Sequence, residues 1–297
     1  MSTVIWRFTD GKAGHDRQSQ GLVRALQQHV DTSVFHIAVE QQTGGFWCWL
    51  SRHYRAGSDL PAPDLLLGAG HATHWHMLAA RRCRGGRIIV LMKPSLPLSW
   101  FDLCLVPEHD GPLRGSNVLP TVGVLNDIQP GSGHDNDTGL IVLGGPSRHF
   151  HWNSDQILLQ LAELVKERPL KKWLLTTSRR TPQALVQSLA GKQAIECVPF
   201  SAGANAWLPA ALAKAGEVWV SEDSVSMICE ALTAGAKVGL LKVQHHKNSR
   251  VGRAVDALVD RGWVGSPGRW QPAAGLQQPL NEAARCADWI KQQWLDP

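Results

Sequence analysis

The residues whose chemistry stands out first lie in the segment TDGKAGHDRQSQGL, residues 9–22, between an apolar run and a helical pattern. A turn from a strand into a helix presents free backbone amides and the positive end of the helix dipole. A neutral imidazole near pH 7 can take a proton from a hydroxyl group. His15 is therefore the predicted general base, and Asp10 or Asp16 is the carboxylate predicted to orient it.

This segment does not have the spacing of an ATP-binding loop. The pattern GxxxxGK[ST] places Lys followed by Ser or Thr after the second glycine, whereas Lys12 follows Gly11, the first glycine. An ATPase is therefore not predicted. The glycines are interpreted as positions where a substrate approaches the backbone closely.

A second segment, LLLGAGHATHWHML, residues 65–78, matches a dinucleotide-binding loop only in part. Thr73 replaces the third glycine, and the next predicted strand ends at Met92 and Lys93 rather than at an acid that would hold a ribose. Its histidines lack carboxylates or cysteines at ligand spacing, so neither an NAD site nor a metal site is predicted. The residues predicted to lie on the acceptor side are Gly11, Lys12, Gly14, His71, Thr73, His74, Lys93 and His109.

Three loops in the second half of the chain, LGGPSRH, TTSRRTP and SEDSVSMICEALTAG, combine glycines, hydroxyl groups and arginines after predicted strands. Such groups bind a pyrophosphate. Helical spacing places Glu230 about two turns beyond a predicted helix start, within reach of a ribose hydroxyl; an exposed structural Glu is the alternative. The predicted donor-binding residues are Gly144, Gly145, Ser147, Thr177, Ser178, Arg179, Arg180, Ser221, Ser224, Ser226 and Glu230.

The elements that position these loops are predicted from alternating short β-branched runs and longer helical patterns, which are typical of βαβ units and parallel sheets. The predicted fold class is α/β, with two Rossmann-like domains facing a cleft, residues 1–130 and 139–297, joined by the polar segment 126–138. A final helix after Leu280 is predicted and is free to pack back on the first domain. The predicted strands are residues 4–8, 33–39, 64–67, 87–92, 103–106, 117–122, 139–143, 172–176, 194–198, 217–220 and 237–241.

The composition is that of a globular protein, with 297 residues, 43% hydrophobic and 19% charged. The chain starts without a long apolar segment and has no apolar run near the roughly 18 residues of a membrane helix, so a cytoplasmic location is expected. Six cysteines without a CxxC pair are interpreted as reduced thiols. The net charge of +5 is modest, and neither a nucleic-acid partner nor a cofactor is predicted.

The aromatic and basic segment FWCWLSRHYR, residues 46–55, has two interpretations. Together with the arginines of residues 81–87 it could rest on the inner membrane surface, near a lipid-linked or lipopolysaccharide-type acceptor. It could equally be a core helix with a basic edge. The membrane-surface interpretation is the one that a sugar acceptor in the cell envelope favours.

Taken together, the motifs DGKAGHDRQSQGL, GAGHATH, KPSLP, FDLCLVPEHD, LGGPSRH, TTSRRTP and SEDSVSMICEALTAG resemble the bacterial branch of the family named after a plant mitochondrial-fission factor, "elongated mitochondria". They cover residues 9–235. The resemblance implies a fold of the GT-B type, two Rossmann-like domains with the architecture of many glycosyltransferases.

More distantly, the chain is similar to the lipid-linked GlcNAc transferase of peptidoglycan synthesis. That resemblance implies a first loop that faces the acceptor, and a second-domain helix whose Glu contacts the ribose of the donor. Glu230 and Gly235 keep the family's spacing of these two residues, whereas DGKAGH replaces a plain Gly-Gly-His. Glu222 and Asp223 stand where a neutral phosphate loop is expected, and they would repel a pyrophosphate unless their side chains point away.

The predicted function is metal-independent transfer of a sugar from a nucleotide sugar to a cell-envelope acceptor. Arginines and helix-end amides would stabilise the departing diphosphate in place of a metal. The alternative is a non-catalytic adaptor that keeps the two-domain shell. A nucleotide-sugar epimerase or hydrolase is less favoured, because the GAGHAT loop is not a dinucleotide site and Tyr54 lacks a lysine four residues on.

Overall fold

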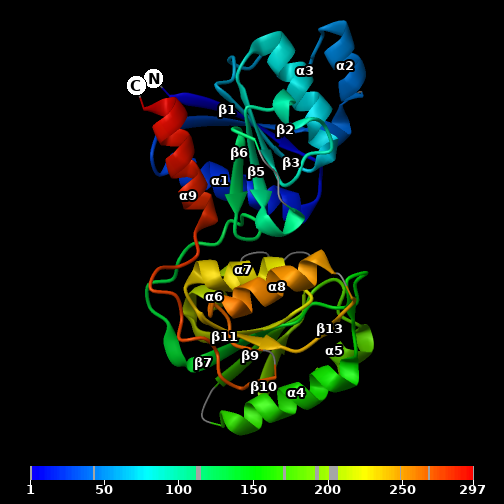
Figure 1. The fold of residues 1–297 in the computed structure, drawn as a ribbon, viewed down its shortest axis with the longest axis vertical. Coiled ribbons are helices and arrows are strands. Elements are labelled where there is room, and N and C mark those ends of the chain that lie inside the picture. Colours follow the sequence, from blue (N-terminus) through cyan, green and yellow to red (C-terminus); the bar gives the residue numbers. More distant parts are fainter. Residues whose placement is uncertain are drawn as a thin grey trace. The chain divides into compact units, whose positions relative to one another are not determined.

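The computed structural model describes residues 2–42, 44–111, 115–169, 172–190, 194–200, 207–247, 249–266 and 268–296. The chain divides into two compact units, Met1–Asp127 with Asn281–Pro297, and Ile128–Leu280. Both have the α/β architecture that the sequence predicts, with parallel strands joined by helices (Figure 1). Each unit is described by itself below.

In the described part of the first unit, six parallel strands form one sheet in the order β2-β1-β3-β4-β5-β6. Its elements are β1 (Thr3–Thr9), α1 (Ala13–Gln27), β2 (Thr32–Ala38), α2 (Gly45–Ser51), β3 (Leu65–Ala69), α3 (His74–Arg84), β4 (Arg87–Leu91), β5 (Leu103–Pro107), β6 (Val118–Thr121) and α9 (Glu282–Ile290).

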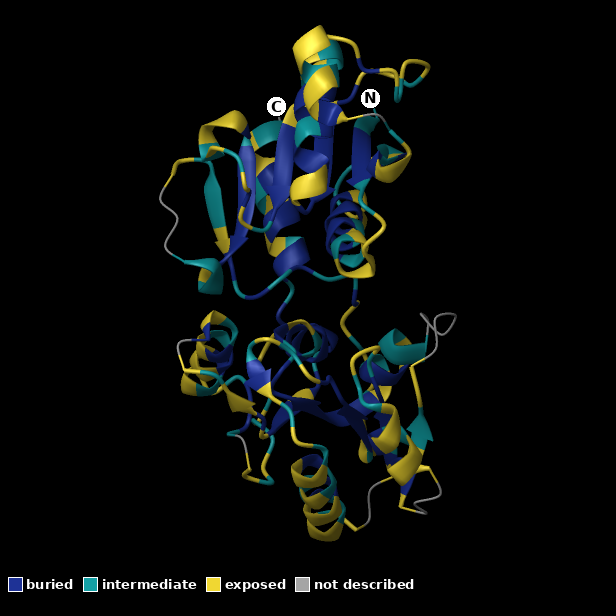
Figure 2. Cartoon of the chain, turned by 90° about the vertical axis from the view of Figure 1, so that its right-hand side faces the viewer, coloured by how far each residue is buried: buried dark blue, intermediate teal, exposed yellow. Residues whose placement is uncertain are grey.

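The apolar runs of these strands serve two cores at once. In β3, Leu65 and Leu67 pack with α1 and α9 on one face of the sheet, whereas Leu66 packs with α3 on the other. Strands covered on both faces need apolar side chains at successive positions, which is why they lack an alternating pattern. The central strands β1, β3, β4 and β5 are mostly buried, as Figure 2 shows.

The C-terminal helix α9 belongs to the first unit. Cys286, Ala287 and Ile290 are fully buried in the same core as Leu22 and Leu26 of α1, and Figure 1 shows α9 beside α1. The backbone amide of Val122 donates to the Glu282 carboxylate, 2.9 Å away. The helix thus packs on the first unit, as the predicted fold allowed, although the predicted domain boundaries place residues 281–297 in the second domain.

In the second unit, the described strands form a five-stranded parallel sheet in the order β10-β9-β7-β11-β12. Its elements are β7 (Asp135–Val142), β8 (Phe150–His151), α4 (Ser154–Glu167), β9 (Lys172–Thr176), α5 (Gln183–Leu189), β10 (Ile195–Val198), α6 (Trp207–Lys214), β11 (Ala215–Ser221), α7 (Val225–Ala234), β12 (Lys237–Leu241), β13 (Gln244–His245) and α8 (Arg250–Asp260).

All eleven predicted strands have counterparts among the described strands, and two differences have clear physical causes. Strand β7 begins at Asp135, inside the predicted linker. This start was not predicted because the first residues of the strand are exposed and carry no apolar signal. Strands β8 and β13 form a separate antiparallel pair of two residues each, which is too short to leave a sequence pattern. No described helix is both long enough and apolar enough to cross a bilayer.

Candidate functional site

The strand order of each sheet reverses at one point, and the loops beside that reversal diverge to leave room for a ligand. In the first unit the reversal lies between β1 and β3, because β2 is on the far side of β1 while β4 follows β3. In the second unit it lies between β7 and β11. The loops that leave these four strands are therefore the places where each unit is expected to bind a substrate.

In the first unit, Asp10 in the loop after β1 is hydrogen-bonded to His15 in the first turn of α1. Nδ1 of His15 lies 3.0 and 2.9 Å from the two carboxylate oxygens of Asp10. The Asp10 side chain is 4% exposed and that of His15 is 20% exposed. The backbone amide of Lys12 also donates to Asp10, and its ammonium lies 3.4 Å from the same carboxylate.

These contacts favour the ionised form of Asp10. Burial works to raise the pKa of Asp10, but the hydrogen bond from His15 and the charges of His15 and Lys12 outweigh it, and the pKa lies below its usual value. An ionised Asp10 accepts a hydrogen bond from Nδ1–H, so Nε2 of the neutral ring has a free lone pair. This is the arrangement of a general base held by a carboxylate.

Gly70, in the loop after β3, makes room for this pair. Its φ is +86°, and a Cβ at this position would lie 2.4 Å from the His15 ring and 3.0 Å from a carboxylate oxygen of Asp10. The hydroxyl and amide of Thr73 both donate to the carbonyl of Gly70, at 2.7 and 3.1 Å, and hold the loop in place. Gly70 is thus explained by packing against the histidine, and Gly68 by packing against Thr73 and Met77.

Asp16 does not orient His15. Its carboxylate pairs with the guanidinium of Arg7, which is 5% exposed and also donates to the hydroxyl of Ser19, 2.9 Å away. Arg7 further donates to the backbone carbonyl of Asp16, at 2.6 Å. Of the two carboxylates that the sequence left open, Asp10 is the partner of His15 and Asp16 fastens α1 to β1.

The remaining acceptor-side residues divide into exposed and buried groups. Gly11, Lys12, Gly14, His71 and Lys93 are exposed and His109 is partly exposed. Thr73 and His74 are buried, which corrects their expected place on a ligand-facing wall.

His74 is a core histidine. Ser95 lies 3.3 Å from its Nδ1, and its ring packs against that of Phe101. Burial, with a smaller contribution from His71, lowers the pKa of His74 to about 4, so the ring is neutral at pH 7. A pattern of histidines looks the same whether the rings are buried or exposed, so His74 and His71 could not be told apart from their spacing alone.

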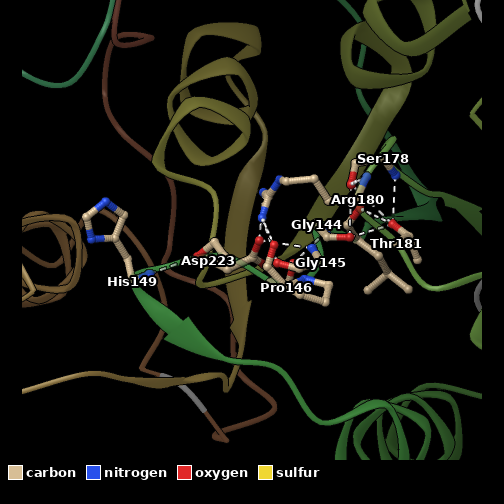
Figure 3. Close-up of polar contacts among 11 residues, drawn as sticks. Gly144, Gly145, Pro146, His149, Ser178, Arg180, Thr181 and Asp223 are labelled. Atoms are coloured by element: carbon tan, nitrogen blue, oxygen red, sulfur yellow. Dashed lines mark hydrogen bonds and ion pairs between the residues drawn. The ribbon is translucent and has the colours of Figure 1, made fainter.

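In the second unit, the loop after β7 is bonded to the loop after β11 (Figure 3). The amide of Gly144 donates to the hydroxyl of Ser221, 2.8 Å away, and that of Gly145 to the carboxylate of Asp223, 3.0 Å away. Both amides, predicted to bind a pyrophosphate, therefore already have acceptors within the protein.

Asp223 is the centre of this network. Its side chain is 0% exposed and accepts from Ser221 at 2.7 Å and from the guanidinium of Arg180 at 2.8 Å. Arg180 also donates to the carbonyl of Gly145, 2.6 Å away. A Cβ on Gly144 would overlap the Asp223 carboxylate. Asp223 therefore occupies the position of an anion in the glycine loop, and the charge of Arg180 is largely neutralised.

The hydroxyl groups after β9 reinforce this closed loop. Ser178 donates to the carbonyl of Gly144 at 2.9 Å, and Thr181, which the sequence analysis did not single out, donates to the carbonyls of Leu143 and Gly144. The hydroxyl of Thr177 accepts from the amide of Phe200. These side chains join neighbouring loops of the sheet.

Glu222 turns away from the glycine loop. Its carboxylate is buried and accepts from the amide of Val243, 2.7 Å away. Burial raises the pKa of Glu222 to about 7, although this hydrogen bond and the charges of His245 and Lys242 oppose the shift. Both acids of the SED sequence are thus directed into the protein.

The other donor-side residues come from the start and middle of α7 and from the loops after β7 and β9. Ser224 is half-buried and Ser226 is exposed, and the side chain of Ser224 does not cap the first turn of this helix. Glu230 is buried on the same helix, and Arg179 is exposed in the loop after β9. Ser147 accepts from the amide of His149.

No group of three or more metal-ligating side chains occurs among the residues that the structure describes.

Comparison with known proteins gives four findings. A family model described as mitochondrial fission ELM1 matches residues 13–294. The uncharacterized protein RP120 of Rickettsia prowazekii is 21% identical over 97% of both chains. UDP-GlcNAc 2-epimerase from Neisseria meningitidis, solved with UDP-GlcNAc bound, superposes with a TM-score of 0.58 at 12% identity over the whole of both chains. Acinetobacter baumannii MurG gives a TM-score of 0.49 at 12% identity, covering 100% of this chain and 91% of that one. The likeness to the epimerase agrees with the GT-B-like fold class.

Proposed function

Since the chain belongs to the mitochondrial fission ELM1 family and has the Rossmann-like units of GT-B enzymes, we propose that it is a glycosyltransferase. In this proposal it moves a sugar from a nucleotide sugar to a hydroxyl of a cell-envelope acceptor without needing a metal. The observation that carries the proposal is the Asp10–His15 pair at the strand reversal of the first unit. A histidine that is kept partly exposed by a buried carboxylate is suited to proton transfer.

The proposed reaction uses the free nitrogen of His15. The acceptor hydroxyl gives its proton to Nε2 as its oxygen forms a bond to C1 of the sugar. The bond from C1 to the phosphate oxygen breaks, and the nucleoside diphosphate leaves with the electron pair. Asp10, 2.9 Å from Nδ1, stabilises the imidazolium that results.

The donor is proposed to bind at the start of α7 in the second unit. Because the amides of Gly144 and Gly145 already have partners, the diphosphate would rely on the first-turn amides of α7, on Ser226 and on the exposed Arg179. Glu230 is the proposed contact of the ribose. This assignment uses fewer of the predicted donor residues than the sequence analysis proposed.

The acceptor is proposed to be presented at the cytoplasmic face of the membrane, where an aromatic patch of the first unit would dock. The patch consists of Phe46, Trp47, Leu50 and Trp100, whose exposed fractions are 41%, 69%, 53% and 37%. Trp47 packs edge-to-face on Phe46. Phe46 and Trp100 each stack on Trp49 and pack edge-to-face on Trp75. Exposed aromatic clusters of this kind mark interaction surfaces.

The charge around this patch favours an anionic lipid surface. The guanidinium of Arg82 lies over the ring of Trp49, 4.9 Å from its centroid. Residues 65–101 contain basic side chains and no Asp or Glu. Tryptophan prefers the headgroup region of a bilayer, and arginines bind its anionic lipids.

Co-sedimentation with vesicles tests the docking surface. We expect wild-type protein to bind vesicles with anionic lipids more than neutral ones, and a Trp47→Ala, Leu50→Ala double variant to lose binding. Leu159→Ala is the matched control, because Leu159 is 58% exposed on α4 in the other unit. Equal binding by the double variant and the control would reject this surface.

Donor binding is tested by thermal stability of wild type and Glu230→Ala with UDP-, GDP-, ADP- and CMP-linked sugars, with and without EDTA. A donor at a hundred times its dissociation constant adds about 2.7 kcal/mol of stability. We expect one donor class to raise the melting temperature of wild type only. Product analysis with that donor then separates transfer from epimerisation and hydrolysis.

One observation favours the alternative, a non-catalytic adaptor. The glycine loop of the second unit is filled by Asp223, so this unit does not need a ligand in the loop to be stable. An adaptor predicts that no donor shifts the melting temperature and that His15→Ala leaves its biological role intact. A donor-specific shift that Glu230→Ala abolishes would exclude it.

A further inference from the structure

A cavity of about 510 Å³ lies in the second unit, apart from the glycine loop and the start of α7. It is bounded by the beginning of α4, the chain after β12 and the segment that carries Trp270. Small-molecule sites have volumes of roughly 300–1,000 Å³. Its principal lining residues are Trp152, Asn153, Gln156, Lys242, Gln244 and Trp270.

The walls of this cavity combine two indole rings with side-chain amides. Trp152 and Trp270 are half-buried, so parts of both indoles remain accessible, whereas Gln156 and Gln244 are exposed at its mouth. Aromatic faces pack against C–H surfaces, and amides both donate to and accept from hydroxyl groups. A ligand that matches both kinds of group has an apolar face and a rim of hydroxyls, as a pyranose ring has.

The charge of the cavity favours an uncharged ligand over a nucleotide. Among its described lining side chains, Lys242 carries one positive charge and Glu163 one negative charge, and these formal charges cancel. A diphosphate is bound through several arginines, lysines or free amides at once. The expected ligand is therefore uncharged.

The lining is held in place before any ligand binds. The indole N–H of Trp152 donates to the hydroxyl of Ser154, 3.1 Å away. Gln160 accepts from the amide of Lys242 at 2.7 Å and donates to its carbonyl at 3.0 Å. On the opposite wall, the carbonyl of Trp270 accepts from Arg168 at 2.6 Å. A rigid site loses little conformational entropy on binding.

We infer that this cavity is a carbohydrate-binding site for a neutral oligosaccharide, with sugar rings against Trp152 and Trp270 and hydroxyls bonded to Gln156 and Gln244. It is separate from the proposed donor site and does not depend on catalysis. It gives the second unit a means of holding a glycan while the proposed transfer site binds its own substrates.

Saturation-transfer NMR on the full chain tests the site with N,N′-diacetylchitobiose, maltotriose and lactose, which present N-acetylglucosamine, glucose and galactose rings. We expect transfer to at least one of these sugars. Trp152→Ala and Gln156→Ala should each weaken its binding about tenfold, as the loss of one good contact does. Trp263→Ala and Gln187→Ala are matched controls that lie outside the cavity and should bind as wild type does.

Two outcomes overturn the inference: no transfer to any of the three sugars, or equal transfer in wild type and both cavity variants. Since Gln156 is exposed, its variant keeps the test valid if Trp152→Ala fails to fold. Failure of the proposed function would give a different result. No nucleotide sugar would then shift the melting temperature, whereas the oligosaccharide would still bind to the wild type and not to the cavity variants.

Discussion

The turns after β1 and β7 occupy equivalent places, each beside the strand reversal of its own sheet, yet their polar groups are used differently. In the first unit, Asp10 is buried and holds His15 partly exposed, so one ring nitrogen remains for a substrate. In the second unit, Asp223 takes the amide of Gly145 and the guanidinium of Arg180, and nothing of its carboxylate is exposed.

At each strand reversal a glycine makes room for a side chain of its own unit. Gly70 lies against His15 and Asp10, and Gly144 lies against Asp223. In neither place does the glycine itself indicate a bound phosphate. The comparison teaches that the topology of a sheet fixes where polar loops gather, whereas the side chains decide whether those groups remain available to a ligand.

The largest effect is expected from His15→Ala in the first unit. Loss of a general base should reduce kcat on the order of a thousandfold. The melting temperature should change little, because His15 is partly exposed. The measurement is release of nucleoside diphosphate from the donor that thermal shifts select, with His29→Ala, a partly exposed histidine that follows α1 in the same unit, as the control. Full activity of His15→Ala would contradict the assignment of His15 as the general base.

Asp223→Ala should cost the second unit about 3 kcal/mol of unfolding free energy, because the buried amide of Gly145 and the Arg180 guanidinium lose their acceptor. Urea denaturation measures the loss, and Asp137→Ala, at an exposed position of β7, should leave stability unchanged. An Asp223→Ala variant that keeps wild-type stability and gains affinity for pyrophosphate would contradict the conclusion that this loop is closed to ligands. The loop would then be an anion site that Asp223 merely covers.

Glu222→Gln should change how the stability of the second unit depends on pH. The pKa of Glu222 is raised to about 7 from a usual 4.5, so between these values the folded chain keeps a proton that the unfolded chain has lost. Wild-type stability therefore falls as pH rises through this window. The amide of Gln still accepts from Val243 and cannot ionise, so at pH 8 the variant should be more stable on the order of 2–3 kcal/mol.

Thermal unfolding of both proteins at pH 4 and pH 8 measures this difference, which should nearly vanish at the lower pH. A constant difference at both values would show that Glu222 ionises normally in the folded protein.

The smallest effect is expected from Asp16→Asn in the first unit. Asp16 is 53% exposed, and Arg7 keeps its bonds to Ser19 and to the backbone, so the loss of stability should be about 1 kcal/mol or less. Turnover should be unchanged, whereas Asp10→Asn should reduce it strongly while His15 remains present. Equal losses of turnover in the two variants would mean that Asp16 also acts on His15.

The fold was largely predictable from the sequence, because strands buried on both faces need uninterrupted apolar runs such as those of β3 and β4. The positions of the chemistry-bearing loops followed from the ends of these strands. The pair β8–β13 was not predictable, since two residues cannot show a period. Burial of His74 was missed because its neighbours in space, Ser95 and Phe101, lie beyond the next strand in the sequence.

The sequence by itself determined that the chain forms two α/β units, that Asp10, Gly144 and Asp223 lie in loops after strands, and that His15 follows Asp10 closely in the chain. Only the tertiary structure decided which of these groups bond to one another. Asp10 rather than Asp16 holds His15, and Asp223 reaches a glycine amide 78 residues away. Hydrogen bonds depend on distance and direction to within fractions of an ångström, and packing of the strands and helices sets these only in three dimensions.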